Sequence, residues 1–169
     1  MKIQVNILSR KEKGTMHALQ HTTYNEPTGE GDLDDLSIGT ETILLVDDEE
    51  PVQYVVREIL ERRGYRVLAA CDGPAALTLS SDFQGPIHLL LTDIVMPRMS
   101  GLEVAKYLAA DRPSIKILYM SGYPETVVFE QERLSPGRYF LRKPFLAPTL
   151  ARKVRQVLND PSMNGSVSH

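Results

Sequence analysis

The chain has 169 residues, enough for one domain of ordinary size plus a tail and too few for a complete multi-domain enzyme. Its 19 Lys and Arg against 22 Asp and Glu give a formal net charge of -3, so nothing in the balance favours a polyanionic partner such as nucleic acid. A hydrophobic fraction of 42% and a charged fraction of 24% are typical of a globular protein and exclude a chain that is disordered throughout.

The leading residues and the cysteine content indicate the setting of the protein. The sequence contains one cysteine, Cys71, which cannot form an internal disulfide, and the first residues hold no apolar run long enough for a signal peptide or a membrane span. We therefore expect a reducing, cytoplasmic setting. Residues 1–40 keep no lasting apolar period and include a stretch rich in Gly, Asp and Glu, which predicts a flexible leader or linker.

From residue 42 onward, short apolar runs alternate with helical patterns. Most of the runs are continuously apolar, which is typical of strands in a parallel sheet whose two faces are both covered by helices. They predict five strands, at residues 43–46, 67–70, 87–91, 115–120 and 139–141.

Helical patterns lie between these runs. Pro51 suits a first helical turn, and apolar residues then recur at helical spacing until Gly64 provides a stop. Ser100 begins a capping-box pattern for a second helix, and Pro148 can begin a last one. Shorter helical periods, interrupted by prolines, follow Gly73 and lie near Glu125.

Strand and helix thus alternate five times, which predicts an α/β fold with a doubly wound parallel sheet and right-handed crossovers. Folds of this class place their ligand sites beyond the carboxyl ends of the strands. The residues that follow each apolar run are therefore the candidates for function.

Acidic residues follow two of the predicted strands. Asp47 and Asp48 come after the first run and Asp93 after the third, so the sheet should bring three carboxylates within a few ångströms. Their repulsion would keep one protonated unless a cation binds, and oxygen ligands suit Mg²⁺, with Asp48 and Asp93 as the direct ligands. The alternative is that each residue only caps a helix or a turn.

The last two predicted strands end in Ser121 and Lys143. A hydroxyl and an ammonium beside the acidic cluster would supply a hydrogen-bond donor and a positive charge to a phosphoryl group. Taken alone, Ser121 more often belongs to an ordinary turn, and Lys143 is more often an exposed lysine before a proline. Their position at the same sheet edge as the carboxylates favours the functional interpretation.

These motifs, in this order, resemble the receiver domain of two-component response regulators, and the resemblance covers residues 41 to about 160 of the chain. It implies a five-stranded (βα)5 flavodoxin-like receiver fold at 41–160, with a disordered tail at 161–169. The segments that carry it read LLVDDE at 44–49, LTDIVMP at 91–97, SG at 100–101, MSGY at 120–123 and KPF at 143–145.

The resemblance implies a phosphorylation site at Asp93. A phosphohistidine on a partner protein would supply the phosphoryl group, while Asp47, Asp48, Asp93 and the backbone carbonyl of Val95 would hold Mg²⁺. Ser121 would bond a phosphoryl oxygen, and Lys143 would pair with Asp93 or with its phosphate. The domain would assist its own phosphorylation and dephosphorylation but would not be an enzyme with a substrate of its own.

The resemblance also implies that the domain transmits its signal by a conformational change. Ser121 would move toward the phosphate, and Phe140 would rotate inward as the switch aromatic. Phe140 could also be an ordinary core or edge aromatic. The family further implies a cis bond between Lys143 and Pro144.

The implied partners are proteins. We expect a sensor histidine kinase or a histidine phosphotransfer protein as donor and a downstream protein target, with homodimerisation left open and with no membrane partner. Direct DNA binding is not expected, because the basic residues Arg152, Lys153 and Arg155 suit a solvated or protein-contacting helix face better than a DNA groove. Val127, Val128 and Phe129 would add apolar surface to that docking face.

Three further alternatives bear on the function. The motifs are especially similar to receivers at the carboxyl end of hybrid sensor histidine kinases, but a stand-alone regulator has the same local chemistry. A phosphorylation-independent interaction scaffold would typically lack the acceptor or the lysine, and Asp93 and Lys143 are both present. An aspartyl phosphatase would need a second aspartate two residues after the nucleophile, where Val95 stands.

Overall fold

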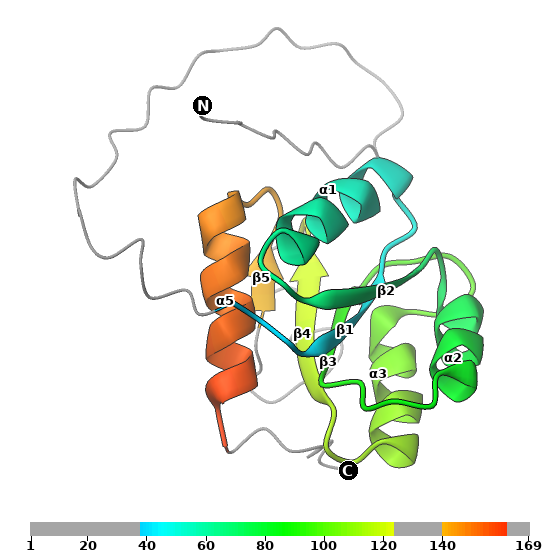
Figure 1. Cartoon of the computed structure of the whole chain (residues 1–169). Coiled ribbons are helices and arrows are strands. Elements are labelled where there is room, and N and C mark those ends of the chain that lie inside the picture. The colour runs from blue at the N-terminus through cyan, green and yellow to red at the C-terminus, as the bar shows by residue number, and fades with distance from the viewer. Residues whose placement is uncertain (1–37, 124–139, 162–169) are drawn as a thin grey trace, which may run out of the picture.

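The computed structural model describes residues 38–123 and 140–161, and within them the chain forms a parallel sheet covered on both faces by helices (Figure 1). The sheet has five strands in the order β2-β1-β3-β4-β5, and each neighbouring pair is parallel. The elements are β1 (Thr42–Val46), α1 (Glu50–Glu61), β2 (Arg66–Ala70), α2 (Gly73–Asp82), β3 (Leu89–Asp93), α3 (Gly101–Asp111), β4 (Lys116–Ser121), β5 (Phe140–Arg142) and α5 (Ala147–Asn159).

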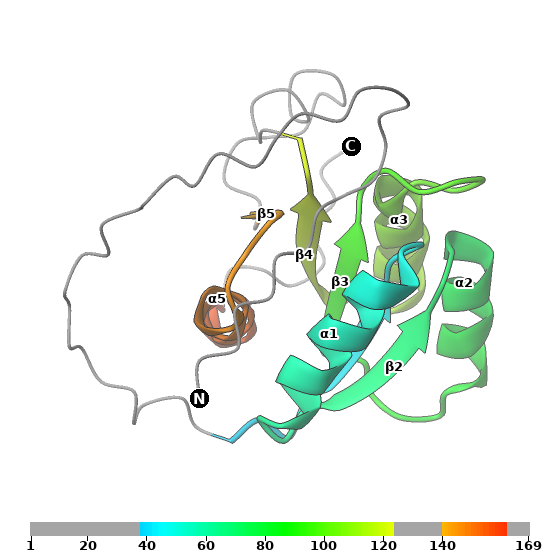
Figure 2. The ribbon, with the colours of Figure 1, turned by 90° about the horizontal axis from the view of Figure 1, so that it is seen from above.

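The two faces of the sheet have separate cores. Helices α1 and α5 cover one face and α2 and α3 the other, as the view from above shows (Figure 2). Successive residues of β1 serve opposite faces, since Leu44 packs with the α2 and α3 side while Ile43 and Leu45 pack with the α1 and α5 side. Burial on both faces explains why the strands are continuously apolar, and it confirms the predicted fold class.

The predicted strands agree with the described ones to within one residue at each end, except for the third. The third run was expected at 87–91, but β3 spans Leu89–Asp93, because Thr92 and Asp93 are polar residues that the fold buries. Helix α2 forms despite Pro74, which lies in its first turn after the Asp72 cap, where a proline needs no amide partner. The capping box at Ser100 is present as predicted.

Several predictions lie outside the described residues: most of the leader at 1–40, most of the tail at 161–169, the helix near Glu125 and the apolar surface at 127–129. The fifth strand was expected from residue 139 and is described from Phe140. In the part of the chain that the structure describes, no helix has both the length and the apolar character that a bilayer crossing requires.

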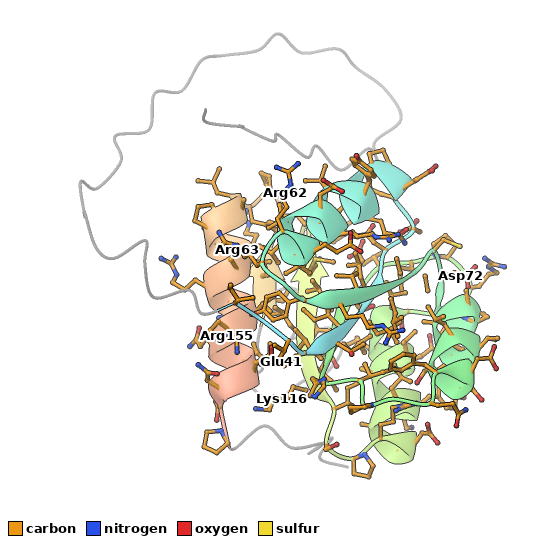
Figure 3. All side chains as sticks on the ribbon, in the orientation of Figure 1. Glu41, Arg62, Arg63, Asp72, Lys116 and Arg155 are labelled. Atoms are coloured by element: carbon orange, nitrogen blue, oxygen red, sulfur yellow. The ribbon has the colours of Figure 1, made fainter. Side chains whose placement is uncertain are left out.

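An ionic network, here called the amino-edge latch, ties α5 to the start of the sheet. Arg155 donates to both carboxylate oxygens of Glu41, at 2.8 and 3.1 Å, and to the hydroxyl of Tyr65 at 2.6 Å (Figure 3). The prediction that Arg155 belongs to an outward basic face is therefore wrong, since its side chain is 16% exposed and engaged within the domain. Arg152 is exposed, as expected.

The end of α5 is held at the same edge of the sheet. The Nζ atom of Lys116, the first residue of β4, donates to the carbonyl oxygens of Leu158 at 2.6 Å and Asp160 at 2.7 Å. These carbonyls lie at and just beyond the last turn of α5, where helical carbonyl groups lack partners within the helix. The cation also opposes the partial negative charge at that end of the helix.

Candidate functional site

The site lies at the carboxyl ends of β1, β3, β4 and β5. Asp47 directly follows β1 and is completely buried, and Asp93 is the last residue of β3, the neighbouring strand. Lys143 directly follows β5, and its backbone amide donates to the carbonyl of Ser121 at the end of β4. Parallel strands thus bring four residues to one edge, although 96 positions separate Asp47 from Lys143.

The ammonium of Lys143 lies between the carboxylates. Its Nζ atom is 2.7 Å from Oδ2 of Asp47, 3.2 Å from Oδ2 of Asp93 and 3.9 Å from Oε1 of Glu49. The lysine side chain is only 3% exposed, so these pairs are shielded from solvent. The reading of Lys143 as an exposed lysine is therefore wrong, and its expected pairing with Asp93 is present in the structure.

The carboxylates that converge are Asp47, Glu49 and Asp93. One oxygen from each lies within 4.8 Å of the others, so this group could hold a metal ion. Asp48, which we expected as a direct ligand, is not in this group. Glu49 takes that place instead, with its own backbone in an extended conformation at φ -94° and ψ 98°.

Sequence reasoning noted Glu49 as an acidic residue but did not assign it to the site. The available signal was its spacing of two from Asp47, since a turn just after the strand can bring two such carboxylates together. The amide of Glu49 also donates to Oδ1 of Asp47 at 3.0 Å, which fixes this turn of the chain.

Burial changes the proton affinities of these groups. Desolvation raises the pKa of Asp47 to about 6, against the opposing attraction of Lys143. The pKa of Asp93 is also raised by burial, against Lys143 and the backbone amides of Ile94 and Val95. Burial works to lower the pKa of Lys143, but Asp93 and Asp47 outweigh it and leave that pKa raised.

The donor set suits a hard divalent cation. With all groups ionised, three carboxylates face one ammonium, so the cluster carries an excess of negative charge in a buried place. The donors are carboxylate oxygens, which Mg²⁺ prefers, and no thiol or imidazole belongs to the converging group. These residues therefore fit the Mg²⁺ that the sequence predicted.

Ser121 lies on β4, the strand next to β3, and Phe140 lies on β5, the edge strand beyond β4. Ser121 is completely buried at the end of β4, and its Oγ accepts a hydrogen bond from the Tyr123 amide at 3.1 Å. Phe140 faces Tyr119 across the β4–β5 pair and packs in the core beneath α3. Phe140 thus already lies inward in this structure, so its role as a switch stays a prediction.

The backbone around the site is closely packed. A Cβ atom on Gly101 would lie 1.9 Å from the carbonyl oxygen of Asp93, so only glycine fits at the start of α3. The hydroxyl of Thr92 donates to that same carbonyl oxygen at 2.9 Å. The peptide bond between Lys143 and Pro144 is cis, as expected.

Comparison with known proteins identifies relatives of this arrangement. A family model described as the response regulator receiver domain matches residues 43–155. The sensor kinase CckA of Brucella abortus (strain 2308) is 36% identical over 125 residues, which are 73% of this chain and 13% of that protein. The receiver protein CpdR of the same organism is 30% identical over 116 residues, which are 69% of this chain and 95% of CpdR.

A solved structure gives the same result for the fold. The crystal structure of the receiver domain from the hybrid histidine kinase CckA is 35% identical, with a TM-score of 0.60, and the match covers 70% of this chain and 99% of that one. The chain thus spans a small part of the sensor kinase and nearly the whole of CpdR.

Proposed function

Because the chain belongs to the response regulator receiver family of two-component systems, we propose that Asp93 accepts a phosphoryl group from a phosphohistidine on a partner protein. The observation that carries the proposal is the position of Lys143, whose buried ammonium contacts both Asp47 and Asp93. A lysine in this place keeps the acceptor ionised and can pair with a phosphate formed on it.

Asp93 supplies the nucleophile. One of its carboxylate oxygens attacks phosphorus in line, the bond from phosphorus to the histidine nitrogen breaks, and the nitrogen keeps the electron pair. The product is an acyl phosphate on Asp93. The attack requires the ionised carboxylate, and Lys143 favours that form against the burial that raises the pKa of Asp93.

Asp47, Asp93 and the backbone carbonyl of Val95 would hold Mg²⁺, with Asp48 as predicted or with Glu49, which the structure favours. The ion, when bound, neutralises carboxylate charge and charge that accumulates on the transferring oxygens. Lys143 remains in contact with Asp93 and offsets part of the same charge.

Ser121 would donate its hydroxyl proton to a phosphoryl oxygen. Its position at the end of β4, next to β3, places it beside the acceptor, and the bond from Tyr123 uses its oxygen rather than its proton. Movement of Ser121 toward the phosphate, together with rotation of Phe140 on the adjacent strand β5, would pass the signal to the surface formed by β5 and α5.

The remaining features of the proposal concern the whole protein. We place the receiver at residues 41–160, between a leader and a short tail, and infer that it assists only its own phosphorylation and dephosphorylation. The donor would be a histidine kinase or a phosphotransfer protein, and the output would be contact with a downstream protein. The proposed setting is the cytoplasm, where such kinases hold their phosphohistidine.

Intact mass after incubation with acetyl phosphate and Mg²⁺ tests the acceptor. The wild type should gain the mass of one phosphoryl group, and Asp93→Asn should gain none. Lys143→Met should label more slowly although Asp93 is present. Equal labelling of wild type and Asp93→Asn would reject Asp93, and absence of labelling in the wild type would favour the interaction scaffold.

A further inference from the structure

Arg98 joins two loops at the carboxyl end of the sheet. It lies in the β3–α3 loop, five residues after Asp93, and its Nη2 donates to Oδ2 of Asp72. Asp72 ends the β2–α2 loop and caps α2, because its Oδ1 accepts from the Ala75 amide at 2.8 Å (Figure 3). Both oxygens of this one carboxylate are thus used, one within its own helix and one on the loop that leaves Asp93.

The backbone of Arg98 is in an unfavourable conformation for its residue type. Its φ of 69° lies in the left-handed region, and no other non-glycine residue with positive φ occurs in ranges 38–123 and 140–161. Arginine has no side-chain group that bonds its own backbone there, as asparagine or aspartate has. In this conformation the Arg98 side chain forms the ion pair with Asp72.

Stability alone is a poor explanation for the pair. The Arg98 side chain is 68% exposed although that of Asp72 is only 12% exposed, and solvent around the guanidinium screens the pair and reduces its contribution to the free energy of unfolding. The cap of α2 uses the other oxygen of Asp72 and does not require Arg98. The unfavourable backbone conformation of an exposed arginine is better explained if the ion pair serves to hold the loop in one position.

That loop contacts the acceptor directly. The backbone at Gly101 packs against the Asp93 carbonyl, since a Cβ there would lie 1.9 Å from its oxygen. The amide of Gly101 donates to the carbonyl of Ile94 at 3.0 Å, and the amide of Ile94 donates to the carbonyl of Met120 at 3.1 Å. The far side of the loop touches α2, since a Cβ on Gly73 would lie 2.7 Å from the Met99 side chain. A shift at Arg98 would therefore reach the backbone next to Asp93 within a few residues.

We propose that Arg98 and Asp72 form a clamp that fixes the loop of residues 94–100 on α2, and that Arg98 is a positioning residue for the acceptor. The clamp holds the Val95 backbone in the place where its carbonyl would bind Mg²⁺. The inference about Mg²⁺ rests on the proposed function. The clamp itself rests on the contacts of Arg98, Asp72 and Met99.

Mg²⁺ binding measured by isothermal titration calorimetry, without a phosphodonor, tests the clamp. Arg98→Gly removes the side chain and tolerates positive φ, and Asp72→Asn keeps an oxygen for the helix cap while removing the charge. Each should raise the Kd for Mg²⁺ about threefold to tenfold, and the double variant should add little because both members act as one unit. Arg98→Lys should give an intermediate Kd.

Arg62→Ala is the matched control, since Arg62 forms an ion pair with Glu58 at 3.2 Å and its side chain is 72% exposed. Its Kd should equal that of the wild type. Thermal unfolding of every variant shows whether a weaker Mg²⁺ affinity comes from a displaced loop or from a less stable domain. An unchanged Kd in Arg98→Gly, or a Kd that moves only as far as stability does across all variants, would overturn the clamp.

Labelling by acetyl phosphate separates this inference from the proposed function. If the wild type binds Mg²⁺ but Asp93 never labels, while Arg98→Gly weakens Mg²⁺ binding, the proposed function fails and the clamp stands. If the wild type labels on Asp93 and Arg98→Gly leaves both Kd and labelling rate unchanged, the clamp fails and the proposed function stands.

Discussion

At the amino end of the sheet, Arg155 meets one carboxylate, Glu41, and donates to both of its oxygens. At the carboxyl end, Lys143 meets three carboxylates and contacts two of them closely. The first network is balanced in charge, and the second, within residues 38–123 and 140–161, has three carboxylates around one ammonium and so an excess of negative charge. The contrast indicates that one end of the sheet is built for stability and the other for a ligand.

The two networks should respond to pH in opposite directions. Glu41 has a lowered pKa, so its stabilisation is present above the unfolded value near 4.5 and is lost as the pH falls through the folded value. Asp47 has a pKa raised from 3.8 to about 6, so its ionisation opposes folding above about 6, and that penalty disappears as the pH falls toward 3.8. The four predictions below test this contrast, from the largest expected effect to the smallest.

Lys143→Met should cause the largest loss of stability. It leaves buried carboxylates without their cation, which costs about 3 kcal/mol in the free energy of unfolding near pH 8. The loss should shrink near pH 5, because the carboxylates then take up protons instead. Urea unfolding at both pH values measures it, with Lys106→Met on the exposed side of α3 as control. An equal loss at both pH values would contradict the charge argument.

Asp47→Asn should stabilise the protein near pH 8, in the absence of Mg²⁺. The change removes a buried ionised group whose pKa of about 6 marks an unfavourable charge, and the gain should be on the order of 2 kcal/mol. The asparagine Oδ1 can still accept from the Glu49 amide. The gain should vanish toward pH 4, and added Mg²⁺ should stabilise the wild type more than the variant. A variant less stable than the wild type at pH 8 would refute the assignment of excess charge.

Glu41→Gln should destabilise the amino-edge latch by about 1 kcal/mol near pH 7. Burial works to raise the pKa of Glu41, but its hydrogen bonds with Arg155 and with backbone amides outweigh burial, and the ionised form is favoured. The difference from the wild type should therefore close as the pH falls below about 4.5. Chemical unfolding across this range measures it, and a constant difference would show that packing rather than charge is responsible.

Tyr65→Phe should have the smallest effect, about 0.5 to 1 kcal/mol. It removes the hydroxyl that accepts from Arg155 at 2.6 Å but keeps the ring under the guanidinium. Neither latch variant should change the Kd for Mg²⁺, because the latch lies at the opposite end of the sheet. Calorimetry with Mg²⁺ checks this, and a shifted Kd in Tyr65→Phe would show that the two ends are coupled.

The sequence predicted the arrangement of the site better than its details. Strand order brings Asp47, Asp93 and Lys143 together whatever the exact bounds of the strands. The positions of the motifs in the sequence were therefore enough to predict that these three residues meet. The bounds of β3 were missed because apolar pattern does not identify Thr92 as a fully buried strand residue. Glu49 was missed because the direction of a side chain just beyond a strand depends on local backbone conformation.

Contacts between residues that are far apart in the chain could not be predicted from the local sequence pattern. Arg155 fits an exposed basic stripe within its own helix, and only the fold reveals Glu41, 114 positions earlier, as its partner. The pair between Arg98 and Asp72 likewise spans 26 positions across two loops. By contrast, the cap of α2 had a local signal, since Asp72 is followed closely by Pro74, and that signal was underweighted.

The attachment of Lys116 to the carbonyls of Leu158 and Asp160 has a consequence for how the domain can be built into longer polypeptides. It fixes the outgoing chain at the edge where Thr42 begins the first strand, remote from Asp93. A domain whose chain enters and leaves at the same edge can be inserted into a longer polypeptide. Flanking modules would then join the domain at the edge of the sheet opposite the carboxylate cluster of Asp47, Glu49 and Asp93.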